Sequence, residues 1–137
     1  MARAGWMSAA VVAVMVAGGA GAAEFRWSGV AEETVGRLES ALAAYRAGQP
    51  NEAKQAVIDA YFGSFEDRKF EAALRKEIGQ QHITEVEGGF NAIRKGIGSG
   101  APPDELAGIV ARLAETLRAD AKLLEARGVP EQVYEGR

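Results

Sequence analysis

The chain lacks cysteine and has a single histidine, His82, among its 137 residues. The absence of cysteine excludes disulfides, thiolate metal sites, covalently attached c-type haem and cysteine nucleophiles. One histidine excludes sites that need two imidazoles, as most catalytic zinc and blue-copper sites do. The net charge of −3 also argues against a nucleic-acid-binding protein, which would show a basic face. With 47% hydrophobic and 26% charged residues, the composition is that of one folded globular domain.

Residues 1–23 have the pattern of a secretory signal peptide. Arg3 is their only charged residue, and an apolar stretch over 9–17 is followed by glycine and alanine. A basic start, a short apolar centre and an Ala-x-Ala-like end predict cleavage after Ala22 or Ala23, and a periplasmic mature protein. The alternative is an uncleaved membrane anchor, because the segment beyond Arg3 is uncharged over about the shortest spanning length.

Cleavage of this segment would change the set of side chains that could bind a metal. All three methionines lie within it, whereas all 19 acidic residues and 15 of the 16 basic residues follow it, so the mature net charge is −4. Without cysteine or methionine, the mature chain offers Cu(I) no soft ligand and haem no axial methionine. Any metal must therefore be held by carboxylates and at most His82, which favours iron, manganese or calcium.

The rest of the chain shows apolar residues at three- and four-residue spacing, with no strand-like alternation. This pattern predicts an all-α fold, an up-down four-helix bundle with an additional short or bent helix over 66–79. We expect the bundle domain to cover residues 24–130. We expect residues 131–137 to form a frayed tail.

Several helix boundaries are also predicted. Asn51 is suited to cap the second main helix, and the glycine- and proline-rich stretch 96–103 predicts the loop before the last helix. The clearest apolar seam, over 83–97, is interrupted by Gly88 and Gly89. We attribute this glycine pair to close helix packing; a functional kink is the alternative.

Two groups of residues are candidate metal ligands. His82 and Glu85 lie three residues apart, so both side chains would share one face of a helix and could reach one ion. Asp59 and Glu66, with Glu71 beyond the charged interruption, could contribute to an all-oxygen iron or calcium site. For both groups the alternative is a solvated helix surface without a ligand.

Two further acids lie beside apolar stripes. Glu87 is next to the 83–97 seam, and Arg94 is its expected partner. Asp120 lies among leucines of the last helix and could face the bundle interior. Each is more typical of a paired structural acid than of a ligand. Since no Gly-x-Ser-x-Gly context and no phosphate-binding glycine loop is present, we do not expect an enzyme.

Three stretches carry a resemblance to a known family. They are Asp59 to Glu66 (Asp-Ala-Tyr-Phe-Gly-Ser-Phe-Glu), Phe70-Glu71, and the run Glu87 to Arg94. The chain resembles the extracytoplasmic helical domain at the N-terminus of bacterial iron permeases of the Ftr type. That family shows Ala-Tyr-x-x-x-Phe-Glu, a nearby Met-Glu and Glu-x-x-Phe-x-x-Ile-Arg. By match to these motifs, the resemblance implies functional roles for Glu66, Glu71, Glu87 and Arg94.

The resemblance implies a free-standing periplasmic relative that serves a membrane iron permease. We therefore expect an accessory protein of iron or other metal uptake that binds the metal weakly and holds no haem. The expected ligands are Glu66, Glu71 and Glu87, with His82 and Glu85 as further candidates. One alternative is a helical adaptor that docks on a permease or a periplasmic partner without binding metal. Another is a periplasmic chaperone with an exposed apolar face that includes Phe62 and Phe70.

Overall fold

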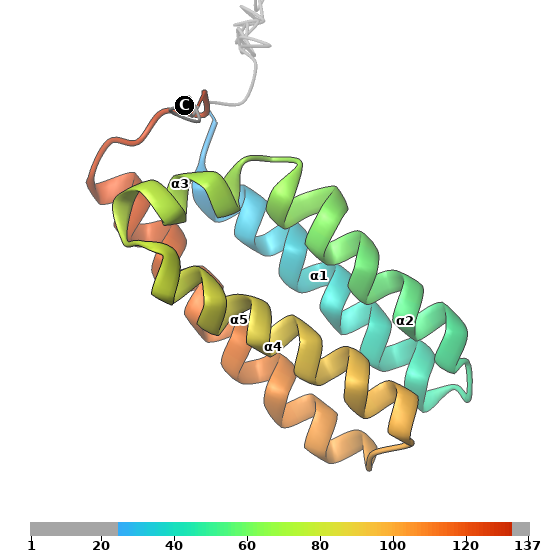
Figure 1. The fold of residues 1–137 in the computed structure, drawn as a ribbon. Helices are drawn as coiled ribbons and strands as arrows, with labels where there is room; N and C mark the ends of the chain where they lie inside the picture. The colour runs from blue at the N-terminus through green and yellow to red at the C-terminus, as the bar shows by residue number, and fades with distance from the viewer. Residues whose placement is uncertain (1–24, 133–137) are drawn as a thin grey trace, which may run out of the picture.

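The computed structural model describes residues 25–132, and these residues form helices and short connections (Figure 1). The predicted signal peptide 1–23 and residues 133–137 of the predicted tail lie outside this range. No helix within residues 25–132 has the length and apolar character that crossing a bilayer requires. The elements are α1 (Trp27–Arg46), α2 (Pro50–Ile58), the π-helix η1 (Asp59–Glu66), α3 (Phe70–Glu77), α4 (Gln80–Ser99) and α5 (Pro103–Ala126).

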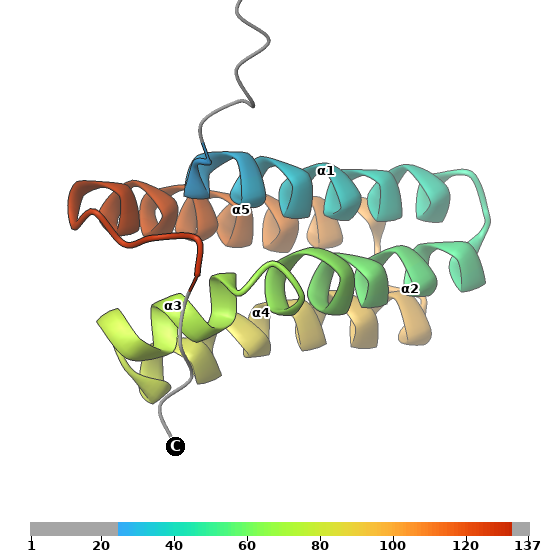
Figure 2. The same cartoon turned by 90° about the horizontal axis from the view of Figure 1, so that it is seen from above.

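The bundle is up-down and consists of α1, α2 with its continuation η1, α4 and α5. α1 packs against α2 and α5, and α4 packs against the same two helices from the opposite side. Seen from above, α1 and α5 make one layer, and α2 with α4 makes the other (Figure 2). The short α3 joins η1 to α4. The all-α bundle with an additional short helix is therefore confirmed.

The end of the bundle where α1 begins and α5 ends is closed by α3. The indole nitrogen of Trp27 donates to the carbonyl of Val129 at 2.8 Å, and its ring stacks on Phe70 of α3 with centroids 5.8 Å apart. Arg127 donates to the carbonyl of Glu77 at 2.7 Å. Because these contacts join α1, α3 and the end of α5, they fix the position of α3 and of the acid it carries, Glu71.

Two predicted boundaries are wrong by a few residues. The second helix begins at Pro50, with Gln49 as its N-cap, rather than being capped by Asn51. Proline suits a first helical position, because its ring fixes φ and its missing N–H has no partner there. The predicted loop 96–103 is too long, since α4 continues to Ser99 and the chain turns at Gly100, with φ of 73°. Gly96 is part of α4 for a packing reason rather than as a loop residue. A Cβ at position 96 would lie 2.4 Å from Leu106 Cδ2 on α5, so glycine permits the two helices to approach closely there.

The packing explanation of the glycine pair in α4 applies to only one of the two positions. A Cβ at Gly89 would lie 3.1 Å from Leu113 Cδ1, so this glycine permits the close approach of α4 and α5. A Cβ at Gly88 would meet nothing within 4 Å. The packing explanation therefore holds for Gly89 and is wrong for Gly88.

The segment η1 is a feature that the apolar spacing did not predict. Its eight residues wind as a π-helix that continues α2, and the N–H of Asp67 bonds the carbonyl of Phe62, five residues earlier, at 3.0 Å. π-helical turns are rare and frequently occur at functional sites. Here the π-helix coincides with the Asp59–Glu66 stretch of the family resemblance.

Candidate functional site

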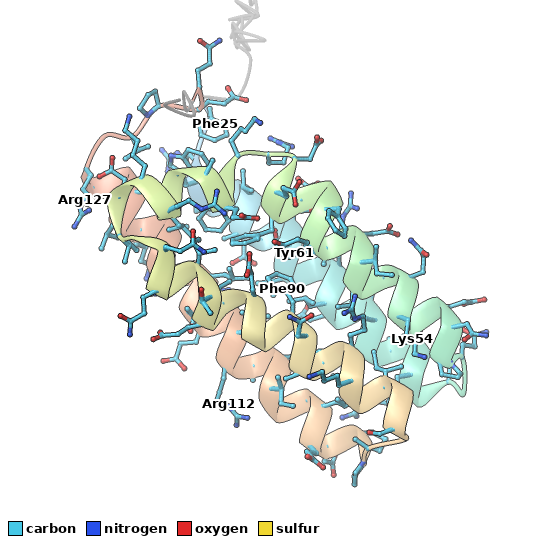
Figure 3. All side chains as sticks on the ribbon, in the orientation of Figure 1. Phe25, Lys54, Tyr61, Phe90, Arg112 and Arg127 are labelled. Atoms are coloured by element: carbon cyan, nitrogen blue, oxygen red, sulfur yellow. The ribbon has the colours of Figure 1, made fainter. Side chains whose placement is uncertain are left out.

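The hydroxyl of Tyr61 lies between two carboxylates from different helices. It is 3.0 Å from Glu71 Oε2 on α3 and 3.1 Å from Glu87 Oε1 on α4. Figure 3 shows Tyr61 and Phe90 in the space between η1 and α4. Three elements thus bring three side-chain oxygens to one point, and the π-helix supplies the central one.

The surroundings of the two carboxylates differ. Glu71 is 7% exposed and forms an ion pair with Arg75, one turn further along α3. Glu87 is half-buried and has the Tyr61 hydroxyl as its partner. The ring of Tyr61 packs against Phe90, with centroids 5.3 Å apart, so the hydroxyl is held at the edge of the core.

The proton of Tyr61 is held tightly. Burial of the phenol, together with its hydrogen bonds to Glu71 and Glu87, raises the pKa of Tyr61 far above its ordinary value of 10. A phenol has one proton, and two acceptors lie within bonding distance of it. The two carboxylates therefore share the phenol proton, and Glu71 also accepts from Arg75.

A cavity of about 230 Å³ opens beside this point. Tyr61 and Glu87 lie on its wall, together with the apolar side chains of α2, η1 and α4. Asn91 and Arg94, further along α4, complete its lining. The cavity is lined by Val57, Ile58, Tyr61, Phe62, Glu87, Phe90, Asn91 and Arg94.

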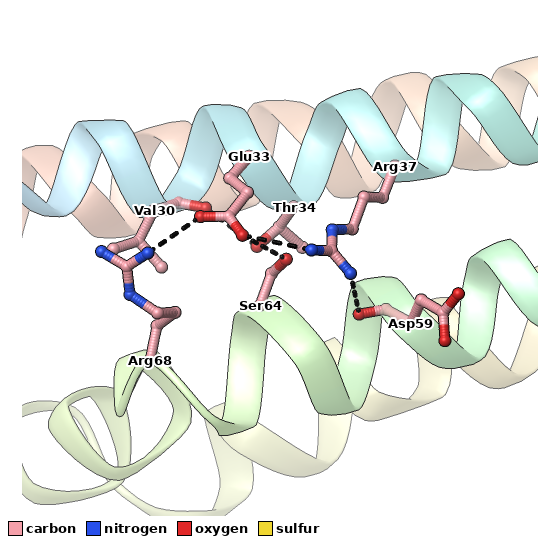
Figure 4. A network of polar contacts seen from close by, with 7 residues as sticks. All are labelled: Val30, Glu33, Thr34, Arg37, Asp59, Ser64 and Arg68. Atoms are coloured by element: carbon pink, nitrogen blue, oxygen red, sulfur yellow. Dashed lines mark hydrogen bonds and ion pairs between the residues drawn. The ribbon is translucent and has the colours of Figure 1, made fainter.

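Glu33 of α1 holds the side of η1 that faces α1. This carboxylate accepts from Arg37 at 3.4 Å, from Ser64 of η1 at 3.3 Å and from Arg68 at 3.2 Å (Figure 4). Arg37 also donates to the Asp59 carbonyl at 3.3 Å. These ion pairs are partly exposed, so each contributes at most about 1 kcal/mol, but together they set the face that η1 turns toward α4.

The acids at the two ends of η1 do not join the Tyr61 cluster. Asp59 is exposed, and its carboxylate accepts from Gln55 at 2.9 Å. Glu66 is exposed and lies with Glu71 and Arg75 along a separate, polar depression. The structure therefore joins Glu71 with Glu87 and leaves Asp59 and Glu66 outside the cluster.

The prediction that Arg94 is the partner of Glu87 is wrong. Arg94 is exposed and donates to Asn91 of its own helix at 3.3 Å, whereas Glu87 bonds Tyr61. The helical spacing within α4 indicates that Arg94 is near Glu87, but it contains no information on η1, which brings the Tyr61 phenol to Glu87.

His82 is paired with Asp120 across α4 and α5. Its Nε2 lies 2.7 Å from Asp120 Oδ2, and Asp120 is 6% exposed, so this acid does face the interior. Burial raises the pKa of Asp120, while the hydrogen bond from His82 acts in the opposite direction. Glu85, the expected co-ligand of His82, is exposed and lines a surface depression that His82 also borders.

Residues 25–132 contain no group of three or more histidine, cysteine, aspartate or glutamate side chains arranged to hold a metal ion. The converging oxygens include the hydroxyl of Tyr61, which is not among the ligands predicted from the sequence. The sequence signal that points to this residue is the position of Tyr61 within the Ala-Tyr-x-x-x-Phe-Glu stretch. Of the face proposed for a chaperone, Phe62 is exposed, whereas Phe70 is fully buried and cannot contribute.

Comparison with known proteins gives this chain no relative. No family model, curated protein or solved structure matches it. The resemblance to the extracytoplasmic domain of Ftr-type permeases therefore stays a prediction from its motifs, and the geometry of the site is the basis for a functional proposal.

Proposed function

We propose that this chain is a periplasmic accessory protein of iron, or other metal, uptake and that Tyr61, Glu71 and Glu87 hold the metal. The observation that supports this most directly is the Tyr61 hydroxyl held between two carboxylates from separate helices. Carboxylate and phenolate oxygens are hard ligands, and tyrosinate is an established ligand of iron in proteins.

The anionic, all-oxygen character of the cluster favours a highly charged hard ion such as ferric iron. When the phenol is ionised, the three oxygen ligands carry three negative charges, of which the ion pair with Arg75 offsets one. The raised pKa of Tyr61 means that the metal must displace a tightly held proton, which a weak Lewis acid such as calcium does poorly. Binding releases that proton, so the affinity for iron rises with pH.

The cellular setting of the proposal rests on the sequence. The predicted signal peptide would deliver the mature chain to the periplasm, where a membrane iron permease is the proposed acceptor of the metal. Weak binding suits such a role, because an accessory protein has to release its metal to the next carrier.

Isothermal titration calorimetry of the mature chain with ferric iron tests the proposal. We expect saturable binding by the wild type, and loss of that binding in Tyr61→Phe and in Glu71→Gln. Glu115→Gln, at an exposed position on α5, is the matched control and should bind iron as the wild type does. The absence of heat above that of buffer, or equal binding by Tyr61→Phe, would sink the proposal.

A second candidate is the adaptor that binds a permease or periplasmic partner without metal. The feature that favours it is Phe62, a large apolar side chain that is 55% exposed at the rim of the cavity. A pull-down with Glu71→Gln/Glu87→Gln and with Phe62→Ser separates the two roles. An adaptor keeps its partner in the first variant and loses it in the second, whereas a metal-dependent contact is lost in the first.

A further inference from the structure

Glu87 and Arg94 place opposite charges at two positions along one cavity. Glu87 is bonded to a neutral phenol, and Arg94 is bonded to a neutral amide. Within residues 25–132 neither side chain forms an ion pair. Both line the cavity of about 230 Å³, and apolar side chains, including Val57 and Phe90, line the wall around them. The cavity thus has a negative position and a positive position that the protein does not itself neutralise.

We propose that the metal is bound together with a small organic carboxylate, whose free carboxylate binds Arg94 and Asn91. This inference rests on the proposed metal site. Iron takes more ligands than the three protein oxygens, and Tyr61 and Glu87 are the two that line the cavity. The remaining coordination positions are therefore open to a ligand in the cavity, and a chelating carboxylate is a hard ligand that fills them.

The dimensions of the cavity fit this class of ligand. Glu87 and Arg94 are seven residues apart on α4, which corresponds to about 10 Å along a helix axis. The cavity of about 230 Å³ that both side chains line has room for a molecule the size of a di- or tricarboxylic acid. A metal ion bound without such a ligand would give the Arg94 guanidinium no anionic partner in the cavity. The planar guanidinium, in contrast, matches a carboxylate with two parallel hydrogen bonds.

Equilibrium dialysis with ferric citrate, in which iron and citrate carry different radiolabels, tests the inference. We expect the wild type to retain iron and citrate together in equal amounts. Arg94→Gln should retain citrate about 10- to 100-fold more weakly, because it loses a charge-assisted contact. The matched control is Lys95→Gln, an exposed neighbouring cation that does not line the cavity, and it should behave as the wild type.

The outcomes separate this inference from the proposed function. If the wild type retains iron without citrate, or if Arg94→Gln retains citrate as the wild type does, the inference is overturned and the metal site stands. If the wild type retains no iron, both are overturned. Since Arg94 is exposed, its replacement leaves the core intact, and the circular dichroism spectrum verifies this.

Discussion

Replacement of Tyr61 by phenylalanine removes the hydroxyl that two carboxylates share and keeps the ring that packs on Phe90. In the metal-free protein, this change isolates the contribution of the phenol to the cluster. Glu71 keeps its ion pair with Arg75, whereas Glu87 loses the hydrogen bond that the structure gives it. The two carboxylates then face each other without a donor between them.

The expected cost follows from the charge on the acceptors. Hydrogen bonds to charged groups contribute about 1.5–3 kcal/mol each, and those to neutral groups about 0.5–1.5 kcal/mol. Near neutral pH, Tyr61→Phe should therefore lower the free energy of unfolding by about 1.5–3 kcal/mol. The same substitution at a tyrosine whose acceptor is neutral should cost only about 0.5–1.5 kcal/mol.

Urea denaturation of the metal-free protein near neutral pH measures the difference. Tyr45→Phe is the matched control, because the Tyr45 hydroxyl donates to the carbonyl of Ala101 at 2.5 Å. A carbonyl is uncharged, so the control variant should show the smaller cost. If Tyr61→Phe costs no more than Tyr45→Phe, the shared-proton description of the cluster is wrong.

Two more predictions concern α4 and its contact with α5. Gly88→Ala should stabilise the protein by about 1 kcal/mol, as measured in urea, because alanine favours a helix and the space beside position 88 is open. Gly89→Ala should be the less stable variant of the two, since its Cβ would lie 3.1 Å from Leu113; equal stabilities would refute the packing explanation. Burial raises the pKa of Asp120, so the folded chain binds this proton more tightly than the unfolded chain. The free energy of unfolding of the wild type, relative to Asp120→Asn, should accordingly fall as the pH rises above about 4, the ordinary pKa of an aspartate; a rise would refute this.

The helices could be predicted because their burial has the period of an α-helix. In α4, the seam over 83–97 is the buried face of the helix, and the core of the bundle follows from such stripes. The same reasoning failed at η1, because a π-helix changes the period and apolar spacing alone does not reveal it. Helix ends do not follow from the local pattern either, because contacts such as that between position 96 and Leu106 depend on a helix that lies later in the sequence.

The candidate site was predicted only in part. Glu71 and Glu87 were among the expected ligands, and the structure brings them together. Their meeting point depends on Tyr61, whose direction is set by the π-helix and by the contacts of Glu33, neither of which a local pattern contains. His82 was assigned to Glu85 by helical spacing, but its partner, Asp120, comes from the adjacent helix.

The visible absorption spectrum during a ferric iron titration tests the central claim most directly. A phenolate that coordinates ferric iron gives a charge-transfer band in the visible range, which carboxylates alone do not give. The account predicts a band in the wild type that saturates at one iron per chain and is absent in Tyr61→Phe. No visible band in the wild type, or an equal band in Tyr61→Phe, would contradict a metal site built on Tyr61, Glu71 and Glu87.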